Sequence, residues 1–121
     1  MPSHHEIRVR RVYDEPDRAH AGARILVDRL WPRGVAKVDV APEEWLKDVA
    51  PSTELRRWYG HEVEKFDEFE RRYRAELRRQ PASAAVEHLL DLAGHRRVTL
   101  LTATRDVPHS GAAVLLEHLE R

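Results

Sequence analysis

Charged side chains that could hold an anion gather in one short stretch, 28–34, with Lys37 just beyond it. Arg29 and Arg33 lie within the stretch, and guanidinium groups bind carboxylate or phosphate through paired hydrogen bonds. Arg29, Arg33 and Lys37 are therefore candidate ligand-binding residues. The structural alternative is that Arg29 pairs with Asp28 or with a helix acid and that Arg33 is solvated.

The same stretch has features of a stiff loop at the end of a buried strand. It follows Ile25-Leu26-Val27, an apolar run typical of a strand covered on both faces. Trp31-Pro32 restricts the backbone at the entry to the loop, and Gly34 permits a conformation closed to other residues. Trp31 is a candidate to stack on a flat ligand. Trp45 and Trp58 lie on predicted helical stripes and are expected in the core.

A second polar group follows the apolar run Val98-Thr99-Leu100-Leu101. Thr102, Thr104 and Arg105 are candidate ligand-binding residues there, and backbone amides of a following helix could meet a phosphate. For Asp106 we expect a plain capping role at the final helix. The chain contains no glycine-rich phosphate loop of either common pattern.

Asp28, His61 and His109 are the candidates for acid–base chemistry, because histidine and a positioned carboxylate can move protons near neutral pH. Each has a structural alternative: an ion pair for Asp28, a helix-start position for His61 and a first-turn position for His109. A Ser-His-Asp arrangement cannot be argued, since Ser52 and Ser110 are expected to be helix caps. No metal site is predicted, because no zinc-type spacing is present.

Composition limits the class of protein. The chain of 121 residues is one domain's worth, with 41% hydrophobic residues and 21 charges of each sign. The zero net charge argues against a general polyanion binder. The absence of cysteine excludes disulfides, thiolate nucleophiles and thiolate metal sites. We expect a cytoplasmic protein without a membrane segment, whose residues 1–6 are disordered.

Apolar periodicity predicts the elements that must position these residues. Strands are expected over 7–13, 23–27 and 97–103. Helices are expected over 42–49, 52–60, 62–79, 82–93 and 110–119, with Phe66, Phe69, Tyr73 and Leu77 forming one inward stripe. The order predicts an α/β domain with a small, mainly parallel sheet flanked by several helices. Because ligands collect beyond the carboxyl ends of parallel strands, both polar groups should face one cleft.

Many residues also match a known family in order along nearly the whole chain. The sequence resembles the YeaO-like family, also called domain of unknown function 488. This resemblance implies a bacterial-type cytoplasmic protein with no proven activity. Longer relatives carry a cysteine after the strand equivalent to 98–102, where this chain has Thr102 and Thr104, so thiol chemistry cannot be transferred. The matching residues are Arg10-Arg11-Val12-Tyr13, Val27-Asp28-Arg29-Leu30-Trp31-Pro32-Arg33-Gly34, Lys37, Trp45-Leu46-Lys47, Ala50-Pro51-Ser52, Leu55-Arg56, His61, Phe69, Arg72-Tyr73, Glu76-Leu77, Val98-Thr99-Leu100-Leu101 and His109.

Three functional hypotheses follow. The first is a cleft for a phosphorylated or carboxylated small molecule, gripped by Arg29, Arg33 and Arg105, with no cofactor assigned. The second is a non-catalytic module that binds nucleic acid or regulates through the arginine-rich helix 62–79. Glutamates interleave with its arginines, which favours a solvated face instead. The third is a structural partner protein with no site.

Overall fold

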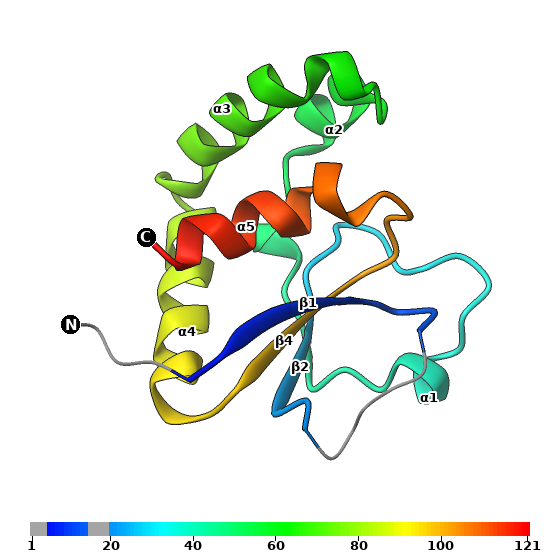
Figure 1. The fold of residues 1–121 in the computed structure, drawn as a ribbon, viewed down its shortest axis with the longest axis vertical. Coiled ribbons are helices and arrows are strands. Elements are labelled where there is room, and N and C mark those ends of the chain that lie inside the picture. Colours follow the sequence, from blue (N-terminus) through cyan, green and yellow to red (C-terminus); the bar gives the residue numbers. More distant parts are fainter. Residues whose placement is uncertain (1–4, 15–19) are drawn as a thin grey trace.

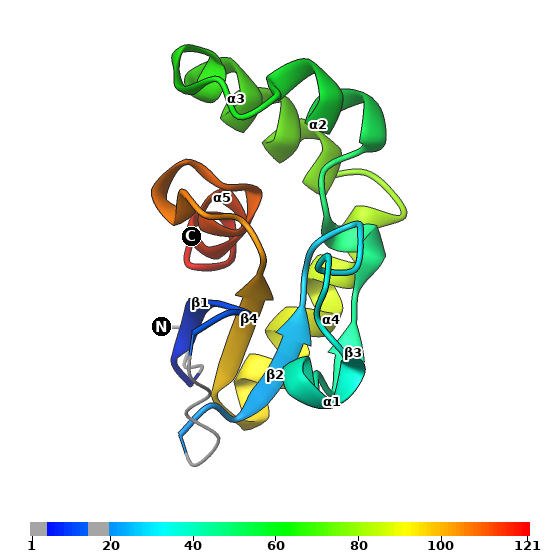
Figure 2. The ribbon, with the colours of Figure 1, turned by 90° about the vertical axis from the view of Figure 1, so that its right-hand side faces the viewer.

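The computed structural model describes residues 5–14 and 20–121, and its centre is a four-stranded parallel sheet (Figure 1). The strands lie in the order β1-β4-β2-β3, and the arrowheads of β4 and β2 point the same way (Figure 2). With helices packed around this sheet, the predicted α/β class is confirmed. The strands are β1 (Ile7–Arg11), β2 (Ala23–Leu26), β3 (Glu44–Trp45) and β4 (Val98–Thr102).

The central strand β4 is buried along its whole length and pairs with both β1 and β2. Leu101 of β4 lies opposite Leu26 of β2. The amide of Val27, the residue after Leu26, donates to the Leu101 carbonyl at 3.1 Å. Val27 and Leu100 are both buried, at 3% and 0% exposure. The prediction that these two apolar runs are neighbours in one sheet is therefore confirmed.

The helices follow the predicted apolar stripes closely, and two serine caps explain where two of them begin. Ser52 accepts a hydrogen bond from the Leu55 amide, and Ser110 accepts one from the Ala113 amide, both at 3.1 Å, as expected for caps. The α-helices are α1 (Lys37–Val40), α2 (Thr53–Tyr59), α3 (Phe66–Leu77), α4 (Ala82–His95) and α5 (Gly111–Leu119), and the 3-10 turns are η1 (Lys47–Val49), η2 (Val63–Lys65) and η3 (Val107–His109).

The helix predicted over 42–49 is wrong. This segment forms β3 and then η1, because the edge of β2 offers backbone groups that the segment can pair with. The Glu43 amide donates to the Arg24 carbonyl at 2.7 Å, and the Leu46 amide donates to the Leu26 carbonyl at 2.8 Å. This tertiary pairing outweighs the local helical signals, such as a proline in the first turn.

Smaller corrections concern the ends of elements. α3 begins at Phe66 rather than at residue 62, after the separate turn η2. α4 continues through Gly94 to His95, so that glycine does not end it. Asp106 makes no side-chain cap, and it precedes η3 rather than α5; Ser110 caps α5 instead.

Two hydrophobic clusters cover the two faces of the sheet. On one face Val98 and Leu100 pack with α2 to α5, and Figure 1 shows α5 beside β1 and β4. The α3 stripe packs into this cluster, with Phe69, Tyr73 and Leu77 at most 2% exposed and Phe66 partly buried, as predicted. On the other face Leu26, Val40 and Leu101 form a smaller cluster, against which Trp31 and Trp45 pack.

At the beginning of the described chain, residues 5 and 6 form hydrogen bonds with α4 and with β4. The His5 amide donates to the Ala93 carbonyl at 2.7 Å, and the Glu6 carbonyl accepts from the Val98 amide at 3.0 Å. Residues 1–6 were expected to be disordered, and of these residues 1–4 lie outside the described residues.

Candidate functional site

A cleft of about 730 Å³ opens at the carboxyl ends of the strands. It receives residues from the segments that follow β1, β2 and β4, from both ends of α2, and from the start of α5. The stretch 28–33 and the stretch 103–106 both line it, so the structure brings the two polar groups together. The lining residues are Arg11, Tyr13, Val27, Asp28, Arg29, Leu30, Trp31, Pro32, Arg33, Ala50, Pro51, Arg56, Tyr59, His61, Phe69, Ala103, Thr104, Arg105, Asp106, Ser110, Gly111 and Ala112.

The cleft lining is cationic although the whole chain is neutral. It contains five arginines and two aspartates, a formal excess of three positive charges. Arg33, Arg56 and Arg105 are exposed, and within residues 5–14 and 20–121 their side chains have no ion pair or hydrogen-bond partner. The Arg11 guanidinium lies over the Tyr13 ring, 5.2 Å from its centroid. Three guanidinium groups are thus available to a ligand without breaking an existing contact.

Asp28 holds the ends of β2 and β4 together. One carboxylate oxygen accepts from the Thr102 hydroxyl and the other from the Ala103 amide, both at 2.7 Å. Burial raises the pKa of the Asp28 carboxyl, and these two hydrogen bonds oppose the rise. Both oxygens have protein partners, which makes Asp28 a positioning group for the cleft loops.

Arg29 ties the loop after β2 to the segment that leads into α2. Its Nε donates to the Pro51 carbonyl at 3.0 Å, and its Nη2 donates to the Ala50 carbonyl at 3.1 Å. The neighbouring Ser52 is held from the other side by Glu76 of α3, which accepts from the Ser52 amide at 2.8 Å and from its hydroxyl at 2.6 Å. Among the residues that the structure describes, Arg29 forms no ion pair with Asp28 or with a helix acid, and its guanidinium group donates to backbone carbonyls instead.

Two tryptophans stiffen the loop after β2. Trp31 Nε1 donates to the Val35 carbonyl and Trp45 Nε1 donates to the Asp28 carbonyl, both at 2.7 Å. The two rings meet edge to face with centroids 5.3 Å apart. Gly34 has a φ of 76°, a conformation that glycine adopts readily. The loop is therefore preorganised, and Trp31 lines the cleft while its indole N–H is used within the loop.

The remaining predicted site residues are divided between the cleft and its surroundings. Thr104 lines the cleft, whereas Thr102 does not: it is buried and its hydroxyl donates to Asp28. Lys37 begins α1, is exposed and does not line the cleft. His61 lines the cleft from the end of α2, with a φ of 59°.

His109 lies in η3, outside the cleft lining. Its Nδ1 is 2.8 Å from a carboxylate oxygen of Asp106, and its ring meets the Phe66 ring edge to face at 5.1 Å. The predicted acid–base set is therefore only partly assembled: Asp28 and His61 share the cleft, and His109 reaches its rim through Asp106.

Several residues that line the cleft were given no site role from the sequence, among them Arg11, Tyr13, Arg56 and Tyr59. A signal existed for the first two, because they follow a strand that is parallel to the others and so ends at the same edge. Arg56 and Tyr59 come from α2, and their spacing in the sequence carries no sign that this helix borders the cleft.

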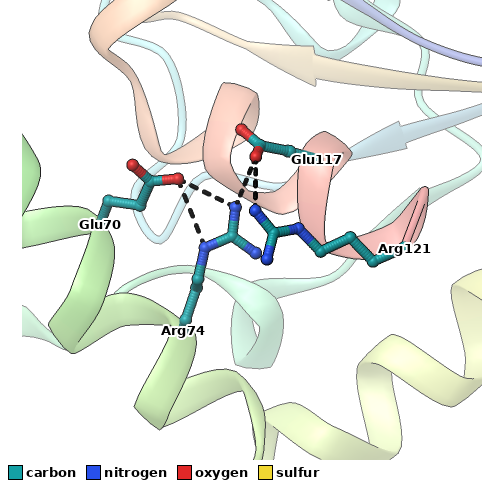
Figure 3. Close-up of polar contacts among 4 residues, drawn as sticks. All are labelled: Glu70, Arg74, Glu117 and Arg121. Atoms are coloured by element: carbon teal, nitrogen blue, oxygen red, sulfur yellow. Dashed lines mark hydrogen bonds and ion pairs between the residues drawn. The ribbon is translucent and has the colours of Figure 1, made fainter.

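The arginine-rich helix α3 is largely neutralised by glutamates. Glu68 accepts hydrogen bonds from Arg71 and Arg72, which hold the pKa of its carboxyl at about 2. Arg74 is buried and lies between Glu70 of α3 and Glu117 of α5, at 2.9 and 3.2 Å, and Arg121 reaches the same Glu117 (Figure 3). Arg74 thus connects α3 to α5, whereas Arg71 and Arg72 pair with Glu68 within α3.

Two further findings concern possible metals and membranes. Within the described ranges, no three His, Asp or Glu side chains are grouped in a way that could hold a metal ion. None of the helices in the same ranges has the length and apolar character needed to span a bilayer.

Comparison with known proteins identifies the family. The model described as the inactive DUF488-N3 subclade matches residues 6–121. The chain belongs to the YeaO-like DUF488 family. Uncharacterized protein Rv3073c of Mycobacterium tuberculosis is 51% identical to this YeaO-like chain over 113 residues, 93% of this chain and 92% of that protein. Uncharacterized protein YeaO of Escherichia coli is 41% identical, over 93% of this chain and 96% of that protein. No solved structure matches. The family predicted from the sequence is thus confirmed.

Proposed function

We propose that the cleft of this YeaO-like protein binds a small phosphorylated or carboxylated molecule and does not transform it. The observation that carries the proposal is the charge of the lining, five arginines against two aspartates in a chain with no net charge. Arg33, Arg56 and Arg105 supply donors that no described residue occupies. A guanidinium group matches the planar fork of a carboxylate or phosphate.

Preorganisation strengthens this proposal. Trp31 and Trp45 fix the loop after β2, and Asp28 fixes it against the loop after β4. A ligand that contacts arginines on both loops does not have to order the loop backbones first. Less conformational entropy is therefore lost on binding.

Several features favour binding over catalysis. The matching subclade is described as inactive, and the chain has no cysteine that could act as a nucleophile. Both carboxylate oxygens of Asp28 are engaged by the protein, and His109 lies outside the cleft lining. The proton-transfer roles of Asp28, His61 and His109 stay predictions, and the proposed function does not use them.

The test is the melting temperature of the protein in inorganic phosphate at constant ionic strength. A ligand at about ten times its Kd stabilises the folded state by roughly 1.4 kcal/mol, or about 5 °C for a domain of this size. Arg33→Ala should weaken phosphate binding by about tenfold or more, because one charge-assisted hydrogen bond contributes about 1.5–3 kcal/mol.

Arg79→Ala is the matched control. Arg79 is also exposed and lies outside the cleft, and no described residue contacts its side chain. Phosphate stabilises proteins non-specifically as well, so only the difference between the two variants is informative. An equal gain in Arg33→Ala and Arg79→Ala would refute the anion site.

A further inference from the structure

The floor of the cleft differs chemically from its mouth. The unpaired arginines lie at the mouth, whereas Val27, Tyr59, Phe69 and Ala112 line the floor and belong to the main hydrophobic cluster. These four residues are at most 5% exposed. The cleft is therefore an opening onto the core of the protein with a cationic rim.

The side-chain hydroxyls at the floor already have partners within the protein. The Tyr59 hydroxyl donates to the His109 carbonyl at 2.7 Å. The Ser110 hydroxyl donates to the Val107 carbonyl at 2.6 Å and accepts from the Ala113 amide at 3.1 Å. The Tyr59 ring is stacked on the Phe69 ring, with centroids 4.2 Å apart. Both hydroxyl protons are thus engaged within the protein, so a ligand hydroxyl over the floor finds neither of them free to donate to it.

Aromatic rings also border the cleft above the floor. Tyr13 is 50% exposed beside the cleft, and Trp31 and His61 line it from two other segments. Ring pairs gain from edge-to-face or offset contacts beyond the area they bury. The volume of about 730 Å³ is ample for one ring with a charged substituent.

From these features we infer that the ligand is amphipathic: a planar aromatic ring that carries a phosphate or carboxylate group. The anionic group meets the arginines at the mouth, and the ring lies over the floor formed by Val27, Tyr59, Phe69 and Ala112. This inference rests on the proposed function, and it adds a preference for an apolar body over a hydroxylated one such as a sugar or glycerol.

Three phosphate probes test the inference: inorganic phosphate, glycerol 3-phosphate and phenyl phosphate. Their apparent Kd values come from melting temperature against concentration, with isothermal calorimetry as a second measurement. Phenyl phosphate is expected to bind about tenfold more tightly than the other two, the gain from burying part of one ring. Benzoate should likewise exceed acetate.

Ala103→Leu tests the location of the ring. Ala103 lines the cleft and is only half-buried, so a larger side chain occupies cleft space with little effect on the core. The variant should lose most of the phenyl phosphate preference and retain inorganic phosphate binding. Val27→Thr, which replaces one methyl group with a hydroxyl at nearly the same shape, should reduce the preference in the same direction.

The two proposals fail in different ways. Equal Kd values for all three phosphates, each weakened by Arg33→Ala, would leave the anion site intact and overturn the aromatic ligand. Tighter binding of glycerol 3-phosphate would also overturn it. Phosphate binding that Arg33→Ala does not change refutes the proposed function. A phenyl phosphate preference that persists unchanged in both Ala103→Leu and Val27→Thr would overturn the ring position over the floor.

Discussion

Replacing Arg29 separates its structural role from a role in ligand binding. The sequence marks Arg29 as a candidate anion ligand, but two of its three guanidinium nitrogens donate to the Ala50 and Pro51 carbonyls. Arg29→Ala removes both hydrogen bonds at once. It also releases the loop after β2 from the segment that leads into α2, which Glu76 holds from the opposite side.

The expected loss of stability is about 2–3 kcal/mol. Each hydrogen bond to a charged donor contributes about 1.5–3 kcal/mol. Two such bonds would sum to about 3–6 kcal/mol. Because Arg29 is partly exposed, solvent screens its charge and water can reach the carbonyls it leaves, so the expected loss lies below that sum. A loss of this size corresponds to about 10 °C in melting temperature for a domain of this length.

Urea denaturation followed by tryptophan fluorescence measures this loss. Arg29→Lys keeps the charge but cannot make the forked contact, so we expect it to lose about half as much. Arg33→Ala is the control for removing an arginine from the same loop, and it should stay within about 0.5 kcal/mol of the wild type. If Arg29→Ala is as stable as Arg33→Ala, the tether is wrong and Arg29 is free to bind a ligand.

Two further predictions concern the core and the carboxylate between the loops. Phe69→Ala should lower the free energy of unfolding by about 3–5 kcal/mol, since Phe69 is 2% exposed; a loss below about 1 kcal/mol in urea would contradict its burial. Burial raises the pKa of Asp28 above its ordinary 3.8. The contribution of this group to the free energy of unfolding is therefore complete below pH 3.8, and it is lost as the pH rises through the pKa that Asp28 has in the folded protein. The stability advantage of the wild type over Asp28→Asn should therefore be larger near about pH 3.5 than near about pH 7, and the opposite trend in urea titrations would refute the shift.

Apolar patterning is sufficient to predict most of this fold. β4 is apolar or threonine throughout and buried throughout, and the α3 stripe repeats at helical spacing, so local sequence and tertiary burial agree. The segment 42–49 is different, because Glu44 and Trp45 pair with the edge of β2. A two-residue strand has no periodicity of its own, and only the neighbouring strand determines its conformation.

The candidate site could be predicted in position but not in composition. Topology alone places the loops after β2 and β4 at one edge, because parallel strands end together. It does not reveal that Arg29 bonds to backbone carbonyls while Arg56 of α2 stands unpaired among the described residues. Those two arginines look alike in the sequence. The two arginines differ in their contacts because of where α2 begins. Ser52 determines that start through its cap and through its two hydrogen bonds to Glu76. A serine that reads as a plain helix cap therefore helps decide which arginines of the cleft lining are tied to backbone carbonyls.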